Sequence, residues 1–203
     1  MTTVDTGPWW AEYADMLHPD MLDMVAAETT AGRITTWETH LVPGLLQTAA
    51  YARAVMAAAS GDPDLVERGA RLRSRRQDAI LRPDLPAELV AYIDEAALRR
   101  VPHGVFMAGQ WAWLLDMANR PNVTIRVLPL DGPPVTRASA PFTLLQTGPA
   151  AARIESLFTE GVGGADLRYG GDVVARYRDL AGLLDLACLP PNASAALISG
   201  LAV

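Results

Sequence analysis

The sequence contains no lysine, and all 17 of its basic residues are arginine. They stand against 23 acidic residues, so the 203-residue chain carries a formal net charge of −6. An acidic chain is a poor DNA binder by itself, because neutralisation of phosphates supplies most non-specific affinity. We therefore expect no direct DNA binding.

Cysteine and histidine are also scarce. The single cysteine, Cys188, excludes an internal disulfide framework and a multi-cysteine zinc site. It stands in an apolar stretch, which predicts a small buried side chain rather than a nucleophile. His18, His40 and His103 show no metal-ligand spacing. We expect neither a metal site nor a cofactor.

Long apolar runs and the common nucleotide or hydrolase motifs are missing as well. No stretch of about 18 apolar residues occurs, and no basic-then-apolar leader precedes Trp9. We therefore expect a cytoplasmic protein with no membrane partner. The sequence has no P-loop, no Gly-x-Gly-x-x-Gly fingerprint and no Gly-x-Ser-x-Gly elbow.

Half of the residues are apolar and a fifth are charged, as in an ordinary globular domain. Period-two patterns predict strands at 33–37, 87–93, 123–129, 140–147 and 151–158. Helical spacing predicts helices at 8–30 (interrupted near Pro19), 45–60, 62–81, 96–100, 107–118, 173–189 and 193–201. The glycine-rich segment 160–171 is expected to be mobile.

The order strand, helix, strand over 87–129 predicts a crossover unit. Gly148-Pro149 predicts the turn of an antiparallel hairpin. The expected fold is one α+β (mixed α/β) domain over 1–203, in which one small sheet of about five strands is covered by six or seven helices.

Candidate chemistry clusters before a predicted tight turn at Pro43-Gly44. Trp37, Glu38 and His40 form an aromatic–acid–imidazole group that could perform acid–base chemistry in a cleft. The alternative is a turn that carries exposed polar residues.

A second acidic group, Asp94-Glu95, follows a predicted strand. We expect these residues to cap the helix that follows. A catalytic role would require one of the two carboxyls to be buried, with a raised pKa.

The helix over 62–81 carries an arginine stripe. Arg68, Arg71 and Arg75 share one face. Such a stripe could bind nucleic acid, and a steep salt dependence would be its mark. We favour a solvated face or internal pairing with carboxylates, since the chain is acidic.

Residue blocks along nearly the whole chain resemble a known family. The blocks are Glu28…Ile34…Trp37-Glu38, Leu41-Val-Pro-Gly-Leu-Leu-Gln-Thr48, Tyr51-Ala-Arg-Ala54, Arg73…Arg76-Gln77, Asp94-Glu95-Ala96…Leu98-Arg99-Arg100, Gln110…Leu114, Val123…Val127-Leu128-Pro129, Phe142, Ile154-Glu155 and Ser194…Ile198. Together they resemble the C-terminal domain of WhiJ-like, or antitoxin-like, helix-turn-helix transcriptional regulators of actinobacteria.

Two features depart from that family. The regulators that this chain resembles have two parts, and a DNA-binding helix-turn-helix of several dozen residues precedes the domain. Here Trp9-Trp10 stands within ten residues of Met1. We therefore expect the DNA-binding helix-turn-helix to be absent. Arg153 stands where the family tends to have an aromatic residue, and Trp111 where it tends to have leucine.

The resemblance implies a sensory or effector domain, from circuits of development or secondary metabolism, that binds a small molecule or a short companion protein and can form a homodimer. An apolar pocket beside Pro43-Gly44 is expected, and the ligand-binding residues that we assign to it are Trp37, Gln47, Met107, Trp111 and Arg153.

The alternative is an enzyme of natural-product biosynthesis, a cofactor-free cyclase or isomerase recruited from this domain. In that case the catalytic residues would be Glu38 or His40 as acid–base and Asp94 or Glu95 as a second acid, with Trp37 and Trp111 as walls.

Overall fold

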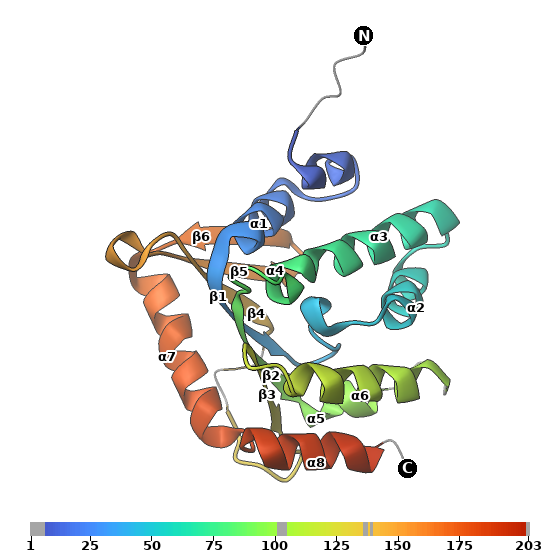
Figure 1. The fold of residues 1–203 in the computed structure, drawn as a ribbon, viewed down its shortest axis with the longest axis vertical. Helices are drawn as coiled ribbons and strands as arrows, with labels where there is room; N and C mark the ends of the chain where they lie inside the picture. The colour runs from blue at the N-terminus through green and yellow to red at the C-terminus, as the bar shows by residue number, and fades with distance from the viewer. Residues whose placement is uncertain (1–6, 101–104, 136–137, 139, 202–203) are drawn as a thin grey trace.

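A computed structural model describes residues 7–100, 105–135, 138 and 140–201 (Figure 1). Its centre is a six-stranded sheet in the order β3-β2-β1-β4-β5-β6. The strands are β1 (Ala31–Glu38), β2 (Glu88–Asp94), β3 (Val123–Leu128), β4 (Phe142–Thr147), β5 (Ile154–Gly161) and β6 (Gly164–Tyr169). β1, β2 and β3 are parallel, and β4, β5 and β6 continue the sheet antiparallel.

The helices surround this sheet. The α-helices are α1 (Pro19–Thr30), α2 (Ala49–Ala59), α3 (Pro63–Arg76), α4 (Asp78–Leu81), α5 (Glu95–Arg99), α6 (Val105–Ala118), α7 (Gly171–Ala187) and α8 (Pro191–Leu201). Short 3₁₀ turns are η1 (Trp9–Tyr13), η2 (Gly44–Leu46) and η3 (Ala150–Ala152). The mixed α+β class is confirmed, with one strand more than expected.

The local sequence explains where several helices begin. Pro19 opens α1, as its fixed φ and missing N–H allow. The Asp62 side chain accepts a hydrogen bond from the Asp64 N–H and so caps α3. Asp94 caps α5 in the same way through the Ala96 N–H at 2.8 Å, which confirms the expected cap.

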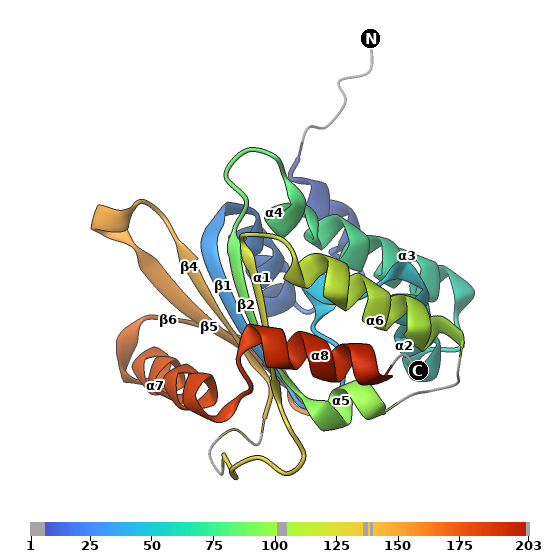
Figure 2. The ribbon, with the colours of Figure 1, turned by 60° about the horizontal axis from the view of Figure 1, so that its bottom comes forward.

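The helices are divided unequally between the two faces of the sheet (Figure 2). Helices α1, α3, α4 and α6 cover one face, where the larger hydrophobic cluster lies. On the other face α7 packs over a smaller cluster that includes Trp37, Phe142 and Leu184. Helix α8 packs on α6 and β3. The sheet therefore has two distinct packed faces.

Alternation along β1 assigns neighbouring residues to opposite faces. Ile34 belongs to the larger cluster and Trp37 to the smaller one. Successive side chains of a strand point to opposite faces of the sheet. Thr36 and Glu38 therefore lie on the same face as Ile34, whereas Thr35 lies on the same face as Trp37. This alternation separates Trp37 from Glu38.

The segment over 160–171, for which the sequence predicted no strand, contains β6. A two-residue turn at Val162-Gly163 joins β5 to β6, and β6 pairs antiparallel with β5. Ala165 and Leu167 pack against the larger cluster, under α1. Strand β6 has no fully buried residue. Its stability therefore comes from the tertiary cover of α1 rather than from a local signal.

Among the described residues, no single helix has the length and apolar character needed to cross a membrane. Helices α7 and α8 meet the criteria only as a pair, and this pair is bent by 70°.

Candidate functional site

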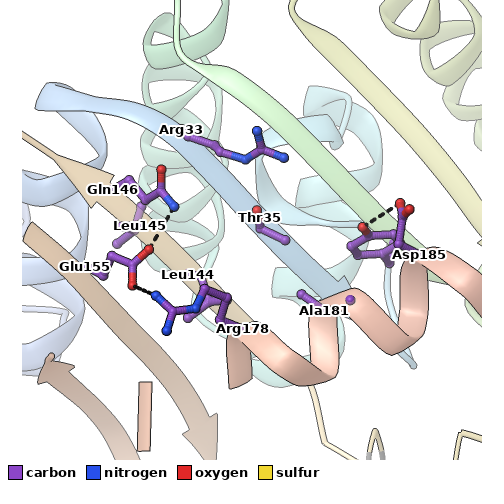
Figure 3. Close-up of a pocket in the computed structure, with 11 residues that line it drawn as sticks. Arg33, Thr35, Leu144, Leu145, Gln146, Glu155, Arg178, Ala181 and Asp185 are labelled. Atoms are coloured by element: carbon purple, nitrogen blue, oxygen red, sulfur yellow. Dashed lines mark hydrogen bonds and ion pairs between the residues drawn. The ribbon is translucent and has the colours of Figure 1, made fainter. Parts of the chain in front are cut away.

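Two cavities lie against the sheet, one on each face. The first, here called the α7 cavity, measures about 410 Å³ and lies between α7 and the strands (Figure 3). The second, here called the Pro–Gly cavity, measures about 130 Å³ and lies beside the Pro43-Gly44 bend. The sequence predicted a hollow at this bend.

The charged groups of the α7 cavity neutralise one another. Figure 3 shows Glu155 between Gln146 and Arg178, from which it accepts hydrogen bonds of 2.9 and 2.7 Å. Asp185 on α7 accepts a hydrogen bond from the Tyr92 hydroxyl at 3.0 Å and pairs with Arg126. Arg33 pairs with Glu88 at 2.9 Å. These contacts tie α7 to the sheet and leave the charged lining groups already partnered.

The Pro–Gly cavity collects side chains from five parts of the chain. It is closed by the sheet on one side and by α1, α3 and the loop after β1 on the other. The residues that line it are Met21, Met24, Glu28, Ile34, Thr36, Glu38, Leu41, Val42, Pro43, Gly44, Leu45, Gln47, Arg73, Arg76, Thr143, Phe158 and Glu160. The lining therefore combines an apolar wall with three acids, two arginines and one amide.

The Pro43-Gly44 bend is held by buried hydrogen bonds. The Leu46 N–H donates to the Pro43 carbonyl at 2.8 Å, and the Val42 N–H donates to the Tyr51 hydroxyl at 3.1 Å. A β-carbon added at Gly44 would lie 3.4 Å from a nitrogen of the Arg76 guanidinium. Glycine at this position lets the bend approach the guanidinium closely.

Gln110 on α6 fixes the next stretch of this loop. Its side chain donates to the Leu46 carbonyl at 2.7 Å and accepts from the Thr48 N–H at 2.8 Å. Gln110 is fully buried. The amide therefore satisfies two backbone groups between η2 and α2, and it fixes the position of Gln47 between them.

Gln47 supplies the most unusual atom of the cavity. Its side chain is only 4% exposed, and its Nε2 donates to the Val42 carbonyl at 2.8 Å. Within the described part of the chain, its Oε1 has no hydrogen-bond partner. A buried acceptor left unpaired costs on the order of 1–3 kcal/mol. This oxygen has almost no accessible surface, so a ligand's donor can pair with it only if the Gln47 amide turns toward the cavity.

Glu38 is the acid whose ionisation the cavity disfavours. Burial, and to a lesser extent the charge of Glu160, raise the pKa of this carboxyl to about 7, and the charge of Arg76 opposes both. Removing a charge from water disfavours the charged form, and a neighbouring like charge has the same sign of effect. Glu38 is therefore poised to exchange a proton near neutral pH.

The two arginines of α3 differ in their partners. Arg76 donates to both carboxylate oxygens of Glu28 on α1, at 2.7 and 2.8 Å. Arg73 donates to the Met56 sulfur and the Gly69 carbonyl instead. Burial, and to a lesser extent the charge of Arg76, lower the pKa of Arg73 to about 10, and the charge of Glu160 opposes both. Both guanidiniums remain cationic at neutral pH.

The structure does not assemble the predicted aromatic–acid–imidazole group. Trp37 lies on the α7 face, where its Nε1 donates to the Ala138 carbonyl at 2.9 Å. His40 is exposed, and its Nδ1 lies 2.6 Å from the Thr39 hydroxyl. Of the three residues, only Glu38 lines the Pro–Gly cavity. Alternation along β1 turns Trp37 and Glu38 to opposite faces, and His40 lies in the loop beyond the end of β1.

Asp94 and Glu95 lie outside the Pro–Gly cavity and have structural partners. Asp94 caps α5. Burial raises the pKa of Glu95, but a hydrogen bond from the Leu130 N–H and the ion pair with Arg99 outweigh burial and hold that pKa below its ordinary value. Glu95 is thus an ionised carboxylate that joins α5 to the loop after β3.

One of the five residues assigned to ligand binding, Gln47, lines the Pro–Gly cavity. Met107 is fully buried in the larger hydrophobic cluster, and Trp111 packs half-buried against the same cluster. Arg153 is exposed between η3 and β5. Trp37 is part of the opposite face, so these four residues do not meet at one site.

Sequence reasoning missed Glu28, Arg73, Arg76 and Glu160 as members of the cavity. Glu28 and the two arginines were part of the residue blocks that suggested the family, but these blocks gave no indication that they meet. Glu160 lies on β5, whose end was predicted at 158 but lies at Gly161. A glutamate on the same helical stripe as Met21, Met24 and Val25 was the available signal for Glu28.

The arginine stripe of α3 is largely paired. Arg68 forms two hydrogen bonds to Asp15, and Arg75 pairs with Glu12 and lies over the Trp9 ring at 4.8 Å. These contacts correspond to the internal pairing that the sequence favoured. The third stripe residue, Arg71, is exposed.

Cys188 is buried, as predicted, at the end of α7. His103 lies outside the described residues.

Comparison with known families gives one match. The profile of a family described as a domain of unknown function (DUF5753) matches residues 21–200. This range includes the whole sheet and all the residues that line the Pro–Gly cavity. Comparisons with curated proteins and with solved structures gave no match.

Proposed function

The chain belongs to the DUF5753 family, and from that premise we propose that it is the sensory domain of a regulator, which binds a small molecule in the Pro–Gly cavity. The resemblance to WhiJ-like regulators supports the regulatory part of this proposal. The most specific block of that resemblance, Leu41–Thr48, is the segment that builds the bend of the cavity. The residues that suggest the family therefore also shape the cavity.

The single observation that carries the proposal is the unpartnered Oε1 of Gln47. This atom is buried in a residue that lines the cavity, and the loop around it is fixed by Gln110 and Tyr51. A preformed apolar cavity with a few convergent polar groups is the usual form of a small-molecule site. A volume of about 130 Å³ favours a small molecule over a segment of a companion protein.

Ligand binding can be tested by thermal unfolding with a library of microbial metabolites at a fixed concentration. A compound that binds only the folded chain raises its stability by an amount that grows with concentration, about 2.7 kcal/mol at 100 times its Kd. Gln47→Leu should abolish this stabilisation. The matched control is Gln146→Leu, which makes the same change in the α7 cavity and should leave it intact.

Two results would count against the proposal. Stabilisation that survives Gln47→Leu but disappears in Gln146→Leu would place the ligand in the α7 cavity. Absence of stabilisation by every compound, together with stabilisation by a short companion protein, would assign the domain to protein recognition instead.

A second candidate, an enzyme, is favoured by one observation. The pKa of about 7 at Glu38 suits a general acid–base that must gain and lose a proton near neutral pH. Incubation with each stabilising compound, followed by mass spectrometry, distinguishes the two functions. A receptor returns the compound unchanged, whereas an enzyme converts it and loses that conversion in Glu38→Gln.

A further inference from the structure

The ionised side chains of the Pro–Gly cavity do not balance. Three carboxyl groups and two guanidinium groups line it: Glu28, Glu38, Glu160, Arg73 and Arg76. If every group is ionised, the lining carries one negative charge in excess, with Glu160 exposed at the edge of the cavity, where water screens its charge. Buried charge without a counter-charge is costly, so the group that is least well compensated takes up a proton or acquires a partner.

The contacts identify which carboxyl lacks a cation. Glu28 holds Arg76 through two hydrogen bonds. Arg73 has Glu160 as the acid that acts on it. Glu38 is left with the charge of Arg76, which already pairs with Glu28, and among the described residues no hydrogen bond to its carboxylate is found. Glu38 is therefore the carboxyl group of the cavity that lacks a paired cation.

We propose that the occupant of this cavity is a small primary amine, bound as its ammonium ion with the nitrogen facing Glu38 and the Oε1 of Gln47. This inference rests on the proposed function and names the chemical class of its ligand. An ammonium group has three donors and no acceptor, which matches two carboxyl groups and an orphaned amide oxygen.

The apolar part of the cavity limits the size and polarity of the rest of the ligand. Its wall is apolar where Met24, Ile34 and Phe158 contribute. A cavity of about 150 Å³ is known to hold benzene, so about 130 Å³ admits a compact hydrocarbon group of four to six carbon atoms. The ligand is thus a short alkylamine or the amine end of a larger molecule that extends toward solvent past the exposed Glu160.

Binding of an ammonium ion must displace the proton of Glu38. In the empty cavity this carboxyl is about half protonated at neutral pH, because burial and Glu160 raise its pKa. The ammonium nitrogen interacts with the carboxylate form, so the proton leaves to the buffer as the amine enters. The other ionisable groups that face this position are Glu28 from α1, Tyr51 from α2, Arg73 and Arg76 from α3, and Glu160 from β5.

The test uses three probes of nearly equal shape: isobutylammonium chloride, isobutanol and sodium isobutyrate. Each is titrated into the isotopically labelled chain at matched ionic strength and at pH 6, 7 and 8, and binding is followed by NMR shifts of cavity methyl groups. We expect the amine to bind about tenfold more tightly at pH 8 than at pH 6, as the ionised fraction of Glu38 rises. The alcohol and the carboxylate should bind at least tenfold more weakly than the amine at pH 8.

Variants separate this inference from a general loss of structure. Glu38→Gln should remove the pH dependence and weaken amine binding at least tenfold, while Glu155→Gln, the matched change in the α7 cavity, should leave both unchanged. Glu160→Gln should lower the pH at which affinity rises, because it removes the like charge that raises the pKa of Glu38.

The outcomes are distinguishable from failure of the proposed function. Tighter binding of isobutanol or isobutyrate than of the amine would overturn the ligand class and leave small-molecule binding standing. Amine binding that is independent of pH or unaffected by Glu38→Gln would also overturn it. Absence of any shift with all three probes, each at about 50 mM, where even the weakest fragments bind, would contradict both proposals.

Discussion

Arg76 on α3 and Glu28 on α1 form two parallel N–H···O bonds of 2.7 and 2.8 Å at the wall of the Pro–Gly cavity. The Glu28 side chain is 2% exposed and that of Arg76 is 11% exposed. This bidentate geometry is the strongest form of an arginine–carboxylate contact. It also neutralises two buried charges, each of which would be costly without the other.

Removing one partner of this pair should therefore destabilise the fold strongly. In Glu28→Gln the Arg76 guanidinium stays buried without its counter-charge, and we expect a loss of about 3–5 kcal/mol in the free energy of unfolding. Urea denaturation followed by circular dichroism measures it. The control is Glu67→Gln, which breaks the exposed pair with Arg53 and should leave the urea midpoint nearly unchanged. Equal midpoints for the two variants would contradict the role assigned to burial.

The raised pKa of Glu38 predicts an unusual dependence of stability on pH. The ordinary pKa of 4.5 applies to the unfolded chain, and the folded value is about 7. Between these values the folded chain binds more protons, so the contribution of Glu38 to stability falls as pH rises from 4.5 to 7 and stays low above 7. The difference corresponds to about 3 kcal/mol.

Glu38→Gln removes this contribution and tests it directly. Because glutamine carries no charge at any pH, the variant should match the parent near pH 4 and exceed its free energy of unfolding by up to about 3 kcal/mol at pH 8. Chemical denaturation at both pH values supplies the comparison. A variant that is less stable than the parent at pH 8 would show that the Glu38 carboxylate has a stabilising partner.

The sequence predicted those parts of the fold whose signals are local. Pro19 at the start of α1, Asp62 before α3 and Asp94 before α5 act through groups within a few residues, and each appears where expected. Strands β1 to β5 were predicted because apolar and polar residues alternate within each strand, which is a local signal. Strand β6 was missed, since its stability depends on α1 packing over Leu167.

The candidate site was predictable only in part, because it is assembled over long distances in the chain. Glu38 and Gln47 were singled out from a short motif and both line the cavity. Glu28 and Glu160 meet there only after α1 and β5 have packed around β1, and no local pattern encodes that meeting. Trp37 was grouped with Glu38 although strand alternation, which was predictable, separates them.

Gln110 should be essential for the shape of the cavity although it does not line it. In Gln110→Leu the Leu46 carbonyl and the Thr48 N–H both lose their buried partner, and each unpaired group costs on the order of 1–3 kcal/mol. We expect lower stability together with loss of ligand-induced stabilisation. Gln110→Glu retains an acceptor for Thr48 and should be less damaging when the carboxyl is protonated at low pH. Unfolding curves at pH 5 and pH 8 compare the two variants.

The rate at which the Cys188 thiol is modified should report on the attachment of α7 to the sheet. Burial raises the pKa of this thiol to about 12, and the positive charge of Arg126 opposes that shift. Arg126 also holds the end of α7 by donating to the Cys188 and Leu189 carbonyls at 2.9 and 3.0 Å and by pairing with Asp185. In the folded chain at pH 8, a disulfide reagent should therefore modify the thiol far more slowly than in urea.

In Arg126→Met, the direction in which the rate of thiol modification changes distinguishes an electrostatic effect on the thiol from a loss of packing. If the charge of Arg126 mattered only through the thiol pKa, its removal would raise that pKa further and slow the reaction. We expect the opposite, a reaction at least tenfold faster, because loss of the three contacts lets the end of α7 open and expose the thiol. Arg168→Met, which breaks an exposed pair with Asp166 on β6, should not change the rate. A slower reaction in Arg126→Met would mean that α7 is held by its apolar contacts with Val174, Leu180 and Leu184 alone.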